Sequence, residues 1–177
     1  MQRAVFLDRD GVINRAIVRD GLPYPPANAA EMEVLPGVSE ALAALKARGF
    51  TLLVVTNQPD VARGTTLRAA VDEMHRVLAE TLPIDRFYAC FHDSADGCAC
   101  RKPRPGMLLE GARDFGIDLA RSYMVGDRWR DCSAGHAAGC RTVFIDYGYR
   151  ERQPDNPTFR ASSLADAARI ILEEQVP

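Results

Sequence analysis

Short apolar runs alternate with amphipathic segments along this chain, and the alternation predicts its fold. We interpret the apolar runs as buried strands at 4–7, 51–55, 87–91, 122–125 and 142–145. Apolar residues at helical spacing predict helices over 38–48, 66–82, 106–115, 131–138 and 163–174. Strands that alternate with helices are typical of α/β proteins, so we expect a Rossmann-type three-layer sandwich with a central parallel sheet.

The segment 15–35 carries three prolines and no clear periodicity, and we predict a loop there. A loop of this length often lines a functional site. It is too short for a separate cap domain, so we expect a single domain over residues 1–177.

Composition narrows the class of protein. The chain is 47% hydrophobic and 26% charged, as expected of a soluble globular protein. Its formal net charge of −2 argues against nucleic-acid binding. No apolar run approaches the roughly 20 residues that cross a bilayer, and the N-terminus does not resemble a signal peptide. We therefore expect a cytoplasmic monomer without a membrane partner.

Polar clusters follow three of the predicted strands. Asp8 and Asp10 follow the first strand, Thr56 and Asn57 the second, and Asp127 the fourth. Because parallel strands place their carboxyl ends at one edge of the sheet, where ligands bind, we expect these clusters to meet.

Asp8 and Asp10 are one residue apart, so they point to the same side of an extended chain. Two close carboxylates repel each other unless a cation or a shared proton is present, and hard oxygen ligands suit Mg²⁺. We predict Asp8 as a nucleophile towards phosphorus, Asp10 as the general acid and base, and Asp127 as a further Mg²⁺ ligand. Taken alone, Asp-x-Asp-Gly also fits a solvated turn.

The other clusters supply groups that bind anions. Thr56 and the backbone N–H of Asn57 are predicted to hold phosphoryl oxygens, although Thr and Asn are also common helix caps. Lys102 would stabilise the transferring phosphoryl group and Arg101 an anionic substrate, although Arg-Lys-Pro also fits a solvated basic turn. Asp131 either orients Lys102 or a metal-bound water, or lies at a helix N-terminus, where the dipole favours an acid.

A second constellation suits a different metal. Cys90, His92, Cys98 and Cys100 fall within eleven residues and form a closed tetrahedral set for a structural Zn²⁺ ion, with iron as the alternative. The other interpretation is three reduced cysteines in a loop. We prefer zinc because free Cys favours the core and this loop is polar. We predict that Cys132, Cys140 and His136 are packing residues, and that His75 and Arg76 lie on the surface.

The four motifs resemble, in order and in position, those of the haloacid dehalogenase-like phosphohydrolases. They are Phe6–Asn14, Val55-Thr-Asn-Gln58, Arg101-Lys-Pro103 and Tyr123-Met-Val-Gly-Asp127. The resemblance implies an aspartyl-phosphate on Asp8 and Mg²⁺ bound by Asp8, the backbone carbonyl of Asp10, and Asp127. It also implies that Thr56 and Lys102 stabilise the phosphoryl group.

Within that superfamily, Cys-x-His and Cys-x-Cys before Arg-Lys-Pro are similar to two groups. They are the heptose bisphosphate phosphatases, which the motifs Ala62-Arg-Gly64 and Pro105–Leu109 also resemble, and the histidinol-phosphate phosphatases. Two features depart from the heptose group: Pro59-Asp60 replaces Ser-Gly, and Arg128 replaces Lys. The loop from His92 to Cys98 is short, which is similar to the histidinol-phosphate group.

The resemblance implies a small phosphorylated sugar as substrate. We expect removal of the 7-phosphate of D-glycero-D-manno-heptose 1,7-bisphosphate, a step towards nucleotide-activated heptose for lipopolysaccharide. Asn57, Gln58, Arg101 and Arg128 are the predicted substrate contacts. The alternatives are a histidinol-phosphate phosphatase and a non-catalytic, zinc-stapled binding domain.

Overall fold

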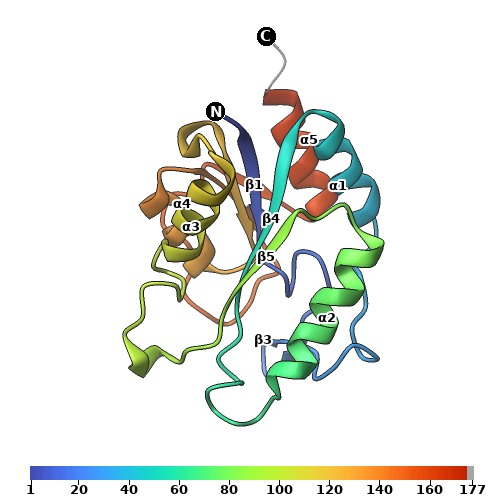
Figure 1. The fold of residues 1–177 in the computed structure, drawn as a ribbon, viewed down its shortest axis with the longest axis vertical. Coiled ribbons are helices and arrows are strands. Elements are labelled where there is room, and N and C mark those ends of the chain that lie inside the picture. Colours follow the sequence, from blue (N-terminus) through green and yellow to red (C-terminus); the bar gives the residue numbers. More distant parts are fainter. Residues whose placement is uncertain (175–177) are drawn as a thin grey trace.

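The computed structural model describes residues 1–174 and has three layers, with a parallel sheet between two layers of helices (Figure 1). The sheet has six strands in the order β5-β4-β1-β6-β7-β8, and each neighbouring pair is parallel. These strands are β1 (Arg3–Leu7), β4 (Phe50–Asn57), β5 (Arg86–Cys90), β6 (Tyr123–Gly126), β7 (Arg141–Ile145) and β8 (Phe159–Ala161). The predicted three-layer sandwich with a parallel sheet is confirmed.

Helices cover both faces of the sheet. They are α1 (Val38–Ala47), α2 (Arg68–Thr81), α3 (Gly106–Phe115), α4 (Trp129–Ala138) and α5 (Leu164–Glu174), with short 3₁₀ turns at Ser94–Asp96 and Leu119–Arg121. Helices α1 and α5 pack on one face, and α3 and α4 on the other (Figure 1). Each predicted helix is present within two residues at either end.

Alternation along the strands divides the core into these two faces. In β1, Val5 and Leu7 join the buried cluster under α1 and α5, whereas Ala4 and Phe6 join the one under α3 and α4. This is the period of two that a strand imposes on its side chains. Both faces of β1 are therefore dry, which holds its carboxyl end in a fixed place.

The segment 15–35 contains a hairpin that the prediction of a loop missed. Strands β2 (Ile17–Arg19) and β3 (Leu22–Tyr24) pair antiparallel around Asp20 and Gly21. Both turn residues have positive φ, 50° and 77°, which a two-residue hairpin turn requires and which Asp-Gly favours. This hairpin is the largest insertion between β1 and α1 in the described chain, which has no large cap there.

One strand was missed and one residue was assigned wrongly. Strand β8 was missed because its three residues are too few to show an alternating pattern. His136 was assigned to packing, but it lies exposed on α4, where its Nε2 is 3.0 Å from the hydroxyl of Thr142. Cys132 and Cys140 are buried, as predicted.

None of the helices within residues 1–174 combines the length and apolar character that crossing a bilayer requires.

Candidate active site

The order of the strands brings the predicted carboxylates together. Strand β1 lies between β4 and β6, so Asp8, Thr56 and Asp127 all emerge at one edge of the sheet. The backbone N–H of Asp8 donates to the carbonyl of Val125 at 3.0 Å, which fixes Asp8 beside the end of β6. Carboxylate oxygens of Asp8, Asp127 and Asp131 lie within 4.8 Å of one another.

Lys102 is buried beside two of these carboxylates. Its ammonium lies 2.9 Å from Asp8 and 2.6 Å from Asp131, and it donates to the carbonyl of Val55 at 2.7 Å. Burial alone would lower the pKa of Lys102, but Asp131 and Asp8 outweigh burial and raise it. Lys102 is therefore a permanent cation at the base of the site.

Asp131 fulfils both alternatives that the sequence left open. One carboxylate oxygen contacts Lys102, and the other accepts a hydrogen bond at 3.0 Å from the backbone N–H of Arg128, at the start of α4. Asp131 therefore holds Lys102 in place and caps the start of α4.

Asp127 is the side chain whose charge lacks compensation. It is buried, and neither of its carboxylate oxygens makes a hydrogen bond of normal geometry within the described residues. Burial, Asp8 and Asp131 raise the pKa of Asp127 well above its ordinary value, and the nearby hydroxyl of Tyr149 offsets this only in part. Asp8 has the same problem to a smaller degree: burial raises its pKa to about 6, although Lys102 opposes the rise.

These features fit a divalent cation between Asp8 and Asp127. A cation would compensate the two carboxylates, and oxygen ligands suit Mg²⁺. Gly11 leaves the necessary room, because a Cβ atom there would lie 1.9 Å from Oδ2 of Asp127.

The Asp10 carboxylate is held by donors on several sides. Arg9 is completely buried and donates to it from Nε at 3.2 Å and from Nη2 at 3.1 Å. Asn14 and Gln58 each donate to it at 2.9 Å. Arg9 and Asn14 were not predicted, although both stand inside the motif that drew attention to Asp8 and Asp10.

Gln58 and His75 lie in places other than those predicted. Gln58 was predicted to contact substrate, but it is buried behind Asp10 and also donates to the hydroxyl of Thr56 at 2.9 Å. Gln58 thus positions the side chains of Asp10 and Thr56 by hydrogen bonds from the protein interior. His75 was assigned to the surface, but it is half-buried on α2 with Nε2 at 3.2 Å from Nη1 of Arg9. Arg76 is exposed, as predicted.

A cavity of about 240 Å³ opens above the carboxylates. The hairpin covers one side of it through Leu22, Pro23 and Tyr24, so the segment 15–35 does line the site. Four arginines contribute to its wall: Arg63, Arg101, Arg128 and Arg130. The cavity therefore has carboxylates at its floor and a wall of mixed charge, in which Asp60 lies beside these arginines.

The residues of the wall that were predicted to contact substrate already bind other groups of the protein. Asn57 uses its side-chain amide to bind the backbone N–H and carbonyl of Lys102, both at 3.0 Å. Arg101 makes only long hydrogen bonds, of 3.4 Å to the hydroxyl of Ser94 and 3.3 Å to the carbonyl of His92. Arg128 forms an ion pair with Glu151, with contacts of 2.5 to 3.1 Å. No sequence signal pointed to Glu151, because it follows no strand and belongs to no motif.

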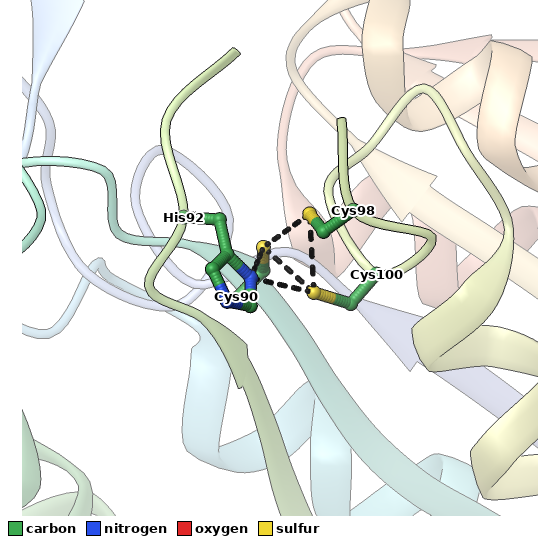
Figure 2. A group of neighbouring side chains, drawn as sticks. All are labelled: Cys90, His92, Cys98 and Cys100. Atoms are coloured by element: carbon green, nitrogen blue, oxygen red, sulfur yellow. Dashed lines mark hydrogen bonds between the residues drawn. The ribbon is translucent and has the colours of Figure 1, made fainter. Parts of the chain in front are cut away.

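Figure 2 shows the second cluster, in which the sulfurs of three cysteines meet Nδ1 of His92. Five of the six distances between the ligand atoms are 2.9 to 3.6 Å, and all of them are within 4.8 Å. Sulfur ligands at 2.3 Å from a tetrahedral zinc ion are about 3.8 Å apart, so the four atoms need only a small expansion to enclose one. Because Cys100 immediately precedes Arg101 and Lys102, such an ion would fix both cations against the sheet.

The model of the haloacid dehalogenase-like hydrolase family matches residues 26–139 of this chain. The chain belongs to the haloacid dehalogenase-like hydrolases.

Similar proteins of known name are phosphatases of that family. The D-glycero-beta-D-manno-heptose-1,7-bisphosphate 7-phosphatase of Bordetella bronchiseptica is 40% identical over 151 residues, which cover 82% of each chain. The enzyme of the same name from Escherichia coli K12 is 37% identical and covers 98% of this chain and 96% of its own.

Solved structures agree with this placement. The D,D-heptose 1,7-bisphosphate phosphatase of B. bronchiseptica, in complex with magnesium and phosphate, superposes with a TM-score of 0.81 at 35% identity. The superposition covers 98% of this chain and 99% of that one. Magnesium in this neighbour agrees with the oxygen ligands found here.

Proposed function

We propose that this hydrolase is a Mg²⁺-dependent phosphatase that removes the 7-phosphate of D-glycero-D-manno-heptose 1,7-bisphosphate. The observation that carries the proposal is the placement of Asp8, Asp127 and Lys102 around the end of β1, beside the Asp10 carboxylate. Relatives with this activity in their names, which align over most of the chain, support the choice of substrate.

The chain's own groups account for both chemical steps. A carboxylate oxygen of Asp8 attacks phosphorus, and the bond to the sugar oxygen breaks as Asp10 gives that oxygen a proton. Asp10 then takes a proton from water, which attacks the aspartyl-phosphate and releases phosphate and free Asp8. When bound between Asp8 and Asp127, Mg²⁺ supplies positive charge that offsets the repulsion between the phosphoryl group and the carboxylates.

Two further side chains stabilise the transferring group. Lys102 lies 2.9 Å from Asp8, close enough for its charge to act on an oxygen bound next to that carboxylate. The hydroxyl of Thr56 accepts a hydrogen bond from Gln58, which leaves its own proton to donate to a phosphoryl oxygen.

The arginine-lined wall suits a substrate with a second anionic group. Arg101 offers a planar guanidinium for bidentate contact with the phosphate that is not cleaved. Arg128 would contribute less to binding, because Glu151 already neutralises much of its charge. Cys90, His92, Cys98 and Cys100 would hold the Zn²⁺ ion that fixes Arg101 and Lys102. We also propose that the protein is cytoplasmic, since a reducing compartment keeps the cysteines free of disulfides and able to bind zinc, and that it is a monomer.

Phosphate release over a panel of substrates tests the proposal. The panel contains the heptose bisphosphate, hexose monophosphates and histidinol phosphate, each assayed with and without added Mg²⁺. We expect Mg²⁺-dependent release that is fastest from the bisphosphate and is lost in Asp8→Asn. A preference for histidinol phosphate would refute the heptose assignment, and full activity in Asp8→Asn would refute the mechanism.

A further inference from the structure

A chain of contacts connects His75 on α2 to the Asp10 carboxylate. The Arg9 guanidinium lies between them and is fully buried. Its Nε and Nη2 groups donate to Asp10 at 3.1 to 3.2 Å, while Nη1 faces Nε2 of His75 at 3.2 Å. Arginine carries only donors, so His75 must be the acceptor in this contact.

The ring of His75 is itself held in place. It stacks on Phe87 of β5 with the ring centroids 4.7 Å apart and an angle of 22° between the planes. Burial and Arg9 lower the pKa of His75 to about 4, so the ring is neutral at physiological pH. A neutral ring that accepts at Nε2 carries its proton on Nδ1.

We propose that His75 is a positioning residue for the general acid and base Asp10. By accepting from Nη1, it fixes the rotation of the Arg9 guanidinium, and so the plane in which Nε and Nη2 hold the Asp10 carboxylate. The inference rests on the proposed phosphatase function, in which Asp10 must point at the leaving oxygen and later at water.

Structure alone also allows a simpler role, in which His75 only satisfies a buried donor. The two roles predict different effects of a His75 substitution on the hydrolysis of different substrates. A residue that only stabilises the fold should affect all substrates alike. A residue that aims Asp10 should matter most where the leaving group needs a proton.

Two substitutions distinguish the effect of the stacked His75 ring from that of its acceptor nitrogen. His75→Phe keeps a flat ring to stack on Phe87 but removes the acceptor. His75→Gln loses the ring but returns an acceptor oxygen near the place of Nε2. Arg76→Ala is the matched control, because Arg76 is exposed on the same helix and pairs only with Glu73 and Glu80 in the ion pairs of the described chain.

The readout is kcat/KM for two substrates with different leaving groups. The sugar phosphate leaves as an alkoxide that requires a proton from Asp10, whereas p-nitrophenyl phosphate leaves as a stable phenolate. We expect His75→Phe to reduce kcat/KM for the sugar phosphate by about 10- to 100-fold, as for other misplaced catalytic groups, and to change that for the aryl phosphate far less. His75→Gln should recover most of the loss, and Arg76→Ala should match the wild type.

A second measurement does not depend on turnover. Nitrogen-15 spectra of the histidine rings, with His75→Phe used for assignment, should show a neutral His75 ring with its proton on Nδ1. A proton on Nε2 would overturn the proposed contact with Arg9. Equal losses on both substrates, or no loss on either, would overturn the positioning role while the phosphatase function stands. A wild-type protein that hydrolyses neither substrate would instead refute the proposed function and, with it, this role.

Discussion

At the scale of single residues, the site stores uncompensated negative charge. Asp127 is buried without a hydrogen bond of normal geometry in the described chain, and burial raises the pKa of both Asp127 and Asp8. Buried carboxylates without partners destabilise the folded protein when no cation is bound, and the same property favours cation binding. Stability and function should therefore respond in opposite directions when Asp127 is changed.

Asp127→Asn removes the charge and keeps the shape. In Mg²⁺-free buffer at pH 7.5 we expect the free energy of unfolding of this variant to exceed that of the wild type by about 1–3 kcal/mol. The variant should therefore unfold at a higher temperature. Added Mg²⁺ should stabilise the wild type and leave the variant unchanged, since binding to the folded state alone raises stability. Thermal unfolding with and without Mg²⁺ measures both effects. Equal stabilisation of the two proteins would place the cation elsewhere.

The same charges set a pH dependence. The pKa of Asp8 is raised from 3.8 to about 6, so between these values the folded protein holds a proton that the unfolded chain has lost. The Mg²⁺-free protein is therefore expected to lose stability as the pH rises from about 4 to 6, by an amount on the order of 3 kcal/mol from Asp8 alone. Unfolding by urea at several pH values measures the slope. Added Mg²⁺ should flatten it, because the cation favours the ionised carboxylates.

Gly11 is required by space as well as by backbone conformation. Its φ is 86°, and a Cβ would strike Asp127. Gly11→Ala should abolish Mg²⁺-dependent activity. Gly139→Ala is the matched control, because Gly139 also has φ of 86° but nothing within 4 Å of its Cβ position. Both variants should lose about 1 kcal/mol from backbone strain; only Gly11→Ala should lose Mg²⁺ binding, as measured by calorimetry.

At the scale of elements, the segment from β5 to α3 depends on the Cys/His cluster. It contains only one short 3₁₀ turn, and its side chains from His92 to Gly97 are largely outside the core. A segment with so few apolar contacts needs another source of order, and a metal site can provide it. A metal ion in this cluster would therefore also hold Arg101 and Lys102, which follow Cys100, in a fixed position.

Cys100→Ser should therefore reduce zinc content and activity together. We expect a loss of kcat/KM of at least about 10-fold, because Arg101 and Lys102 are no longer held, with the rest of the sheet still folded. Metal analysis, activity and hydrogen exchange over 91–105 report on these three effects. Cys140→Ala, a buried cysteine outside the cluster, should cost some stability while it keeps zinc and activity. Wild-type exchange rates in a zinc-free protein would contradict the structural role.

At the scale of the whole molecule, stability and catalysis are supplied by different regions. The carboxyl edge of the sheet carries the charged groups, whereas α1 and α5 form a dry layer with the sheet away from that edge (Figure 1). Leu42 on α1 is completely buried in this layer.

Leu42→Ala tests that separation. We expect it to lower the free energy of unfolding by about 2–5 kcal/mol, from lost burial and the cavity left behind, without a change in kcat at a temperature where the protein is folded. Denaturant unfolding and steady-state kinetics measure the two quantities. Leu67→Ala, at a side chain that is 77% exposed, should change neither. A large fall in kcat for Leu42→Ala would show that the core and the site are coupled.

The sequence by itself determined the layered fold, the meeting of Asp8, Thr56 and Asp127, and the membership of the zinc set. The periods of strands and helices are local properties, and a parallel sheet gathers strand ends by topology. Tertiary structure alone decided that Gln58 donates to Asp10, that His75 contacts Arg9, and that Glu151 pairs with Arg128. These contacts join residues up to 66 positions apart, such as Arg9 and His75, and no local pattern of polarity encodes such a pairing.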